Sequence, residues 1–183
     1  MTDQRNRNRF TRFLLPSIAS LSLGACALPA KHVHTSIDID APPSDVWRVL
    51  ADTASYPEWN PYHVEVRGGL AEGAPLTVRI EKPNGHKLSI DPVVLRVEPE
   101  RELTWGGGLR GIFVGEHVFE LEPLPAGATR LVQRESFVGL AVPFARLEAI
   151  EEGYGEVNRA LKTRAEALRT RAGAGGSATA PRP

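Results

Sequence analysis

The sequence takes up a long helical hydrophobic period after Pro143, and this change limits the folds that the chain can adopt. From Leu76 to Gly139, apolar and polar residues alternate in short runs separated by turn residues, as in β-strands. After Pro143, apolar residues recur every three or four positions, which predicts one amphipathic helix of about 28 residues and about 42 Å. Its apolar positions are Phe144, Leu147, Ile150, Tyr154, Val157, Leu161, Ala165 and Leu168.

The part before Pro143 predicts one strand, two short helices and then a run of antiparallel strands. Lys31 to Asp40 alternates as a half-buried strand. Ala41-Pro42-Pro43-Ser44 supplies a helix start, and a second short helix is expected at Thr53 to Tyr56. The later strands are expected at His63 to Arg67, Leu76 to Glu81, Lys87 to Val97, Glu102 to Trp105, Gly115 to Glu122 and Arg130 to Phe137. The fold class is therefore α+β, with a curved antiparallel sheet wrapped around the long C-terminal helix.

The length of 183 residues suits one domain. We expect this domain to span residues 33–171. The following segment, AGAGGSATAPRP at residues 172–183, holds no large apolar side chain and is expected to be disordered.

The first 25 residues are typical of an export signal. An arginine-rich start precedes the apolar run Phe13 to Leu23, which is too short to span a bilayer permanently. Without residues 1–25, which hold four arginines and one aspartate, the chain keeps 18 basic and 21 acidic residues. That slightly acidic balance argues against nucleic acid as a partner.

Cys26, the only cysteine, lies where the apolar run ends. Leu23-Gly24-Ala25-Cys26 resembles the lipobox of bacterial lipoproteins, in which the cysteine becomes the lipidated first residue. This resemblance implies an exported protein whose linker, residues 26–32, is anchored by lipid at the periplasmic face of the outer membrane. Ordinary signal cleavage at Ala25-Cys26-Ala27 and a buried free thiol are the alternatives.

Four segments carry a resemblance to a known superfamily. They are IDIDAPPSDVWRVLADTASYPEWNPY, GEHVFELEP, TRLVQRESFVGL and VNRALKTRAE. In their order and pattern they resemble the helix-grip fold of the START and SRPBCC superfamily, often described as polyketide cyclase/dehydrase or lipid transport proteins. The resemblance covers Val33 to Arg171 and implies an apolar cavity between sheet and helix, with the loop after the short helices at its mouth.

The stretch SYPEWNPY places three aromatic residues on a segment broken by two prolines. If the resemblance holds, Trp59 and Tyr62 lie at the cavity mouth, while Tyr56 anchors the short helix. The alternative is that all three cover the core, as buried aromatics usually do.

Two ionisable residues are expected to face each other inside the cavity. A hairpin that turns near Ala126 sets His117 opposite Glu135, with Gln133 on the same side. Such a pair suits acid/base work or a hydrogen bond to a ligand, and a purely structural pair is the alternative. The full set of expected ligand-binding residues is Trp59, Tyr62, Trp105, Phe113, His117, Phe119, Gln133, Glu135, Phe137, Tyr154 and Asn158.

Glycines mark two further features. Gly106 to Gly111 matches G-x-G-x-x-G but leads into a strand rather than a helix, so we interpret it as a bulged loop at the cavity edge and not as a nucleotide site. Gly153 and Gly155 flank Tyr154, which suggests that room is needed beside this ring, and Asn158 lies one turn later. No metal site or cofactor is expected, because the histidines are scattered and His32-x-His34 faces outward.

Three functions fit these features. The first is an envelope-anchored protein that binds a small hydrophobic molecule such as a lipid, quinone or polyketide-like compound. The second is an enzyme similar to a polyketide cyclase or dehydratase that uses His117 and Glu135 as acid and base. The third is a structural or interaction protein of the envelope, with a filled core.

Overall fold

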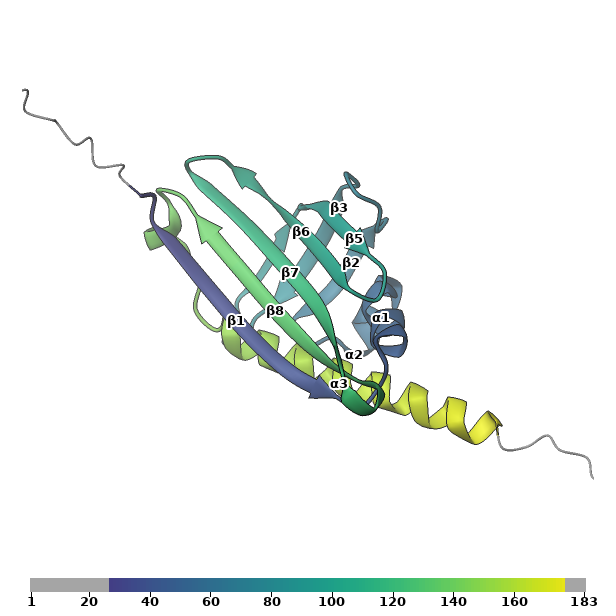
Figure 1. Ribbon diagram of the computed structural model, residues 1–183. Helices are drawn as coiled ribbons and strands as arrows, with labels where there is room; N and C mark the ends of the chain where they lie inside the picture. Colours follow the sequence, from purple (N-terminus) through teal and green to yellow (C-terminus); the bar gives the residue numbers. More distant parts are fainter. Residues whose placement is uncertain (1–26, 177–183) are drawn as a thin grey trace, which may run out of the picture.

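The computed structural model describes residues 27–176 and shows the expected α+β helix-grip architecture (Figure 1). The first strand, β1 (Ala30–Ile39), leads into the helix α1 (Pro43–Ala51), the 3-10 turn η1 (Thr53–Ser55) and the short helix α2 (Tyr56–Trp59). The strands that follow are β2 (His63–Gly68), β3 (Leu76–Glu81), β4 (Lys87–Ile90), β5 (Val93–Glu98), β6 (Glu102–Leu109), β7 (Phe113–Leu124) and β8 (Ala128–Val138), with the turn η2 (Pro125–Gly127) between the last two. The turn η3 (Val142–Phe144) then precedes the long helix α3 (Ile150–Gly176).

The strands form two antiparallel sheets rather than one continuous meander. The larger sheet has the order β1-β8-β7-β6-β5, and the smaller one has the order β2-β3-β4. The expected strand from Lys87 to Val97 divides at Asp91-Pro92 into β4 and β5, because proline has no N–H to donate to a ladder. The two sheets meet where the N–H of Leu76 donates to the carbonyl of Pro92 over 2.8 Å.

The terminal helix begins later than its hydrophobic period suggests. Phe144 belongs to η3 and is 86% exposed, and Ala149 has a φ of 57°, which interrupts any helix running from Pro143. From Ile150 onward the apolar positions face the larger sheet, with Tyr154, Val157 and Leu161 all buried. The helix extends to Gly176, so residues 172–176 continue α3 rather than belonging to a disordered tail. Residues 177–183 lie outside the described part.

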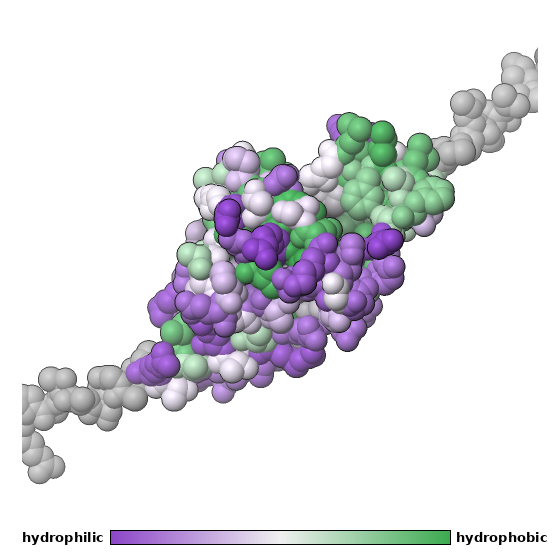
Figure 2. Space-filling model, turned by 180° about the vertical axis from the view of Figure 1, so that it is seen from behind, coloured by the Kyte–Doolittle hydropathy of each residue, from purple (hydrophilic) through white to green (hydrophobic). Residues whose placement is uncertain are grey.

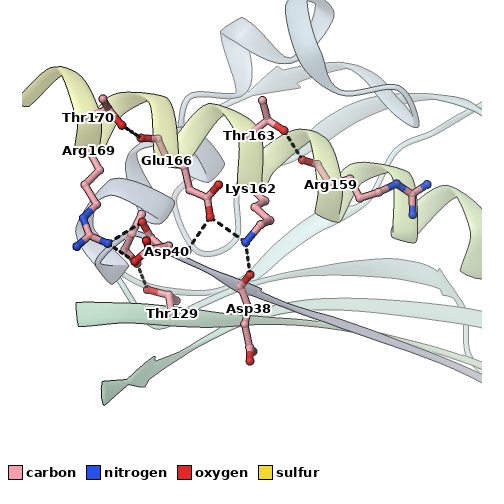
Figure 3. Close-up of polar contacts among 10 residues, drawn as sticks. Asp38, Asp40, Thr129, Arg159, Lys162, Thr163, Glu166, Arg169 and Thr170 are labelled. Atoms are coloured by element: carbon pink, nitrogen blue, oxygen red, sulfur yellow. Dashed lines mark hydrogen bonds and ion pairs between the residues drawn. The ribbon is translucent and has the colours of Figure 1, made fainter. Parts of the chain in front are cut away.

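Polar contacts attach the second half of α3 to the end of β1 (Figure 3). Lys162 Nζ donates to the carbonyl of Asp38 over 2.7 Å, and Glu166 accepts the N–H of Asp40 over 2.8 Å. Arg169 donates to the carbonyl of Asp40 over 2.8 Å. These exposed contacts therefore join the second half of α3 to the end of β1.

The boundaries at the N-terminus also differ from expectation. β1 starts at Ala30, so residues 30–32 belong to the sheet and are not linker. Cys26 and the export segment lie outside the described residues. No helix between residues 27 and 176 is long and apolar enough to cross a membrane.

Candidate functional site

A cavity of about 370 Å³ lies between the larger sheet, the smaller sheet and the start of α3. Figure 2 shows a hollow with an apolar floor on this side of the molecule. Most of its wall is aromatic, aliphatic or glycine. The lining residues are Tyr62, His63, Ile80, Lys82, Leu88, Ile90, Asp91, Pro92, Trp105, Gly106, Gly107, Gly108, Phe113, Gly115, His117, Glu135, Phe137, Arg146, Leu147, Ile150 and Tyr154.

Stacked rings hold His117 in the cavity wall. Its imidazole lies between Phe119, with ring centres 4.2 Å apart, and Tyr154, with ring centres 4.5 Å apart, and both pairs are nearly parallel. Trp105 meets it edge-on at 5.6 Å. Because these rings are buried and close-packed, the His117 ring has little freedom to turn.

A chain of hydrogen bonds defines which nitrogen of His117 carries its proton. Asn158 Nδ2 donates to Thr35 Oγ1 over 3.1 Å, so Asn158 Oδ1 accepts from Gln133 Nε2 over 2.7 Å. Gln133 Oε1 then faces His117 Nε2 at 3.1 Å and accepts a hydrogen bond from it, so Nε2 carries the proton. The lone pair of the neutral ring is therefore on Nδ1.

His117 Nδ1 faces a carboxyl group. It lies 3.4 Å from Glu135 Oε2, and β7 and β8 pair these two residues directly, as the hairpin register predicts. Tyr154 donates its hydroxyl proton to the same oxygen. The carboxyl group thus connects the sheet to α3, and it is part of the cavity wall.

Burial disfavours the charged form of both members of this pair. Desolvation raises the pKa of Glu135 to about 7, and the hydrogen bond from Tyr154 opposes that rise. Burial, and then the neighbouring His63, hold the pKa of His117 well below its usual value. A carboxylic acid therefore lies beside an imidazole lone pair inside an apolar cavity, which is an arrangement that can give or take one proton.

His63 is a cavity residue that the sequence analysis did not single out. It is 2% exposed, and its ring lies 5.3 Å from that of His117 and 5.9 Å from that of Tyr154. Burial lowers its pKa to about 3, so the ring is neutral. Within residues 27–176 its Nδ1 has no hydrogen-bond partner. The sequence did offer one indication of this role: His63 follows Pro61 by two residues and is the first residue of a strand, β2, that has a buried face.

Seven of the eleven residues expected to bind ligand do line the cavity. They are Tyr62, Trp105, Phe113, His117, Glu135, Phe137 and Tyr154. That these residues contact a ligand stays a prediction, because their position in the cavity wall does not by itself show binding.

Four expected residues lie elsewhere. Trp59 packs edge-on against Tyr56 at 5.0 Å and donates to Ser55 Oγ, since the turn of α2 points it toward the later part of α3. Phe119 is 1% exposed and lies behind the rings of His117 and Trp105. Gln133 and Asn158 hydrogen-bond to each other between sheet and helix, so their polar groups are used internally.

The glycines also differ from their interpretation. Gly106 to Gly108 are in the β6 ladder rather than in a loop, although they do line the cavity edge. A Cβ on Gly106 would approach the carbonyl oxygen of Gly115 to 2.6 Å. Gly153 makes room for the ring of Tyr62 rather than for Tyr154, and Gly155 faces only Arg159.

A cationic edge completes the cavity. The side chain of Lys82 is largely buried, and its Nζ donates to the carbonyl of Arg146. Desolvation lowers the pKa of Lys82. Asp91 lines the same cavity, so the rim carries two basic residues and one acidic residue.

Comparisons with known proteins agree with this architecture. Residues 30–171 match the family model for polyketide cyclase/dehydrase and lipid transport. A comparison with curated protein sequences gives no match.

Solved structures show the same fold at low identity. The Zhui aromatase/cyclase from Streptomyces sp. R1128 is 19% identical, with a TM-score of 0.62 over 75% of this chain and 94% of its own. Protein NE0264 from Nitrosomonas europaea is 19% identical, with a TM-score of 0.61 over 76% of this chain and 96% of its own. Norcoclaurine synthase from Thalictrum flavum is 12% identical, with a TM-score of 0.59 over 78% of this chain and 98% of its own. The START-like helix-grip fold is thereby confirmed.

Proposed function

Because the chain belongs to the polyketide cyclase/dehydrase and lipid transport family, we propose that it binds a small hydrophobic molecule in the cavity between sheet and α3. The observation that supports this proposal is the 370 Å³ space itself, which has aromatic and aliphatic walls and few polar groups. Ligand sites of proteins have this character and usually measure about 300 to 1,000 Å³. A protein with a purely structural role would gain stability from filling such a space.

The dimensions and chemistry of the cavity favour a compact ligand with one polar group. Its volume is near the lower end of the usual range, which suits a quinone-like or polyketide-like ring compound or a single short acyl chain better than a diacyl lipid. Glu135, whose raised pKa keeps part of the population protonated near pH 7, offers a hydrogen bond within the apolar wall, and His63 is a second polar group there.

We propose further that the protein is held at the cell envelope by a lipid on Cys26. The support is the lipobox-like Leu23-Gly24-Ala25-Cys26 after an apolar run. Mass spectrometry of the mature N-terminal peptide tests this directly. A peptide that begins at Cys26 and carries acyl chains is expected, whereas an unmodified N-terminus would end the anchoring proposal.

Native mass spectrometry tests ligand binding. Protein isolated from its own host is expected to carry a molecule that is released on denaturation. The matched variant is Gly115→Leu, because a Cβ at Gly115 would lie 3.4 Å from Glu135 Oε1 and the Phe137 ring, so that the leucine occupies the cavity. Equal occupancy in the wild type and this variant would place the ligand outside the cavity.

A second candidate function is acid/base catalysis on the bound molecule. The observation in its favour is the Glu135–His117 pair at 3.4 Å, in which protonated Glu135 can donate a proton and the neutral His117 ring can accept one. Glu135→Gln keeps the shape but cannot exchange the proton, so it should retain binding and lose turnover. Unchanged turnover would exclude Glu135 as the catalytic group.

A further inference from the structure

Large apolar side chains are exposed together at the end of the molecule where the described chain begins. Phe144 is 86% exposed, and Leu109, Leu140 and Ile112 are all at least half exposed. We call these four residues the apolar end. Isolated exposed leucines are normal on protein surfaces, but a cluster marks an interaction site.

Backbone hydrogen bonds show that the four residues form one surface. The N–H of Leu140 donates to the carbonyl of Gly111 over 3.1 Å, and that of Ala141 donates to the carbonyl of Ile112 over 2.8 Å. The β6–β7 hairpin tip is thus bonded to the segment that leads into η3. Figure 2 shows a predominantly apolar lobe at this end of the molecule, beside the hollow.

The apolar end adjoins the cavity edge. Gly108 and Phe113, which line the cavity, flank the hairpin tip that carries Leu109 and Ile112. Leu147, on the opposite edge, follows Phe144 by three residues. A surface that covered the apolar end would therefore also lie against the cavity mouth.

The N-terminus leaves the domain at the same place. The N–H of Gly139 donates to the carbonyl of Pro29 over 2.9 Å, and β1 begins at the next residue, Ala30. Cys26 precedes Pro29 by only three residues, so an extended chain separates their Cα atoms by at most about 10 Å. A lipid on Cys26 would bring the bilayer surface within that distance of Pro29, which is hydrogen-bonded to Gly139, the residue before Leu140.

We propose that the apolar end is a membrane-docking surface that rests on a phospholipid bilayer and turns the cavity mouth toward it. The proposal rests on the lipid anchor proposed above, because the short chain between Cys26 and Pro29 would hold this end of the domain close to the bilayer. Arg110 and Arg146 are exposed beside the four residues, with Glu148 the nearby acidic group, and the two guanidinium groups favour anionic headgroups. In this orientation an apolar ligand passes between bilayer and cavity with little exposure to water.

Site-specific fluorescence in vesicles tests the docking. Since Cys26 is the only cysteine and is consumed by lipidation, Phe144→Cys in the full-length protein accepts one polarity-sensitive dye. The protein is placed in vesicles of phosphatidylcholine and phosphatidylglycerol, with or without brominated acyl chains. We expect the dye at 144 to emit as in an apolar medium and to lose more than half of its intensity to the brominated lipids.

The matched control is Glu122→Cys with the same dye. Glu122 is exposed near the other end of β7, nine residues from Phe113 and so about 30 Å along the strand. Its dye should emit as in water and be quenched little. A second variant, Leu140→Glu with Phe144→Glu, is expected to keep the lipid anchor and slow the transfer of an apolar, environment-sensitive dye from vesicles to the protein at least several-fold, relative to Leu95→Glu on the exposed part of β5.

Water-like emission at both 144 and 122, in protein that is bound to the vesicles, would overturn the docking proposal. Apolar emission at 144 that grows with protein concentration in the absence of vesicles would overturn it too, since a second copy would then cover the surface. The N-terminal mass separates the two ideas. If Cys26 carries no lipid, the anchor fails, and quenching of a dye on Phe144→Cys in a Cys26→Ser background, mixed with vesicles, still decides whether the apolar end binds lipid.

Discussion

Gly153 and Gly155 lie two residues apart in α3, and alanine is expected to change stability in opposite directions at these positions. In an open helix interior, replacing glycine by alanine stabilises by up to about 1 kcal/mol, because the backbone loses less entropy on folding. Gly155 meets this condition, since a Cβ there would find only the end of the flexible Arg159 side chain, at 3.5 Å. Gly155→Ala should therefore raise the free energy of unfolding by about that amount.

Gly153 is different because the Tyr62 ring occupies the space of its missing side chain. A Cβ at Gly153 would lie 2.1 Å from Cδ2 and 2.5 Å from Cε2 of Tyr62. The ring must move by roughly 1.5 Å to reach ordinary contact, and it is held between the rings of His63 and Tyr154. Overpacking of this kind costs about 1 to 3 kcal/mol. After the helix gain is subtracted, Gly153→Ala should lie between neutral and about 2 kcal/mol less stable than the wild type.

Thermal unfolding followed by circular dichroism measures the difference between the two variants. For a chain of this length, 1 kcal/mol corresponds to about 2 to 4 °C in Tm, so the variants should differ by several degrees with Gly155→Ala the more stable. Gly153→Ala should also weaken binding of an apolar dye, because the Tyr62 ring that must move is part of the cavity wall. Equal stabilisation by both substitutions would refute the packing of Tyr62 on α3.

Three further predictions follow from the site and the anchor. Stabilisation from a protonated Glu135 is complete below pH 4.5 and is lost as the pH rises through about 7. Urea unfolding at several pH values should therefore show that the free energy of unfolding of the wild type falls by about 3 kcal/mol relative to that of Glu135→Gln over this pH range. A difference between the two proteins that stays constant with pH would contradict the raised pKa. Cys26→Ser should move the protein from the detergent phase to the aqueous phase in a phase partition, unless the anchor idea is wrong. Trp105 lines the cavity, so its fluorescence should change when ligand binds. Trp59→Phe should show the same change in fluorescence as the wild type. If the change disappears in Trp59→Phe, the ligand lies near Trp59 and outside the cavity.

Periodic features of the sequence predict most of the fold and part of the site. The change of period after Pro143 gives the sheet-and-helix architecture, and alternation within two strands joined by one turn is enough to pair His117 with Glu135. Both inferences need only local repeats, because side-chain direction in a strand or helix follows from the backbone period.

Features that do not follow a repeat in the sequence could not be predicted in this way. The direction of the Trp59 side chain depends on the four-residue helix α2, which is too short to show a hydrophobic period in the sequence. Gln133 in β8 and Asn158 in α3 are 25 residues apart in sequence, and only the three-dimensional structure reveals the hydrogen bond between them. His63 is buried among rings that β6, β7 and α3 contribute. The residue pattern of its own strand does not predict these neighbours.

The central claim is that the space between the larger sheet and α3 is a ligand cavity, and a titration tests it most directly. An apolar, environment-sensitive dye is added to the wild type and to Gly115→Leu, and both dye emission and Trp fluorescence are followed. We predict saturable binding of one dye per wild-type chain and none by Gly115→Leu, with the melting temperature of the variant no lower than that of the wild type. Equal binding by both proteins, or no binding by either together with strong destabilisation of the variant, would mean that the aromatic wall is only part of the core.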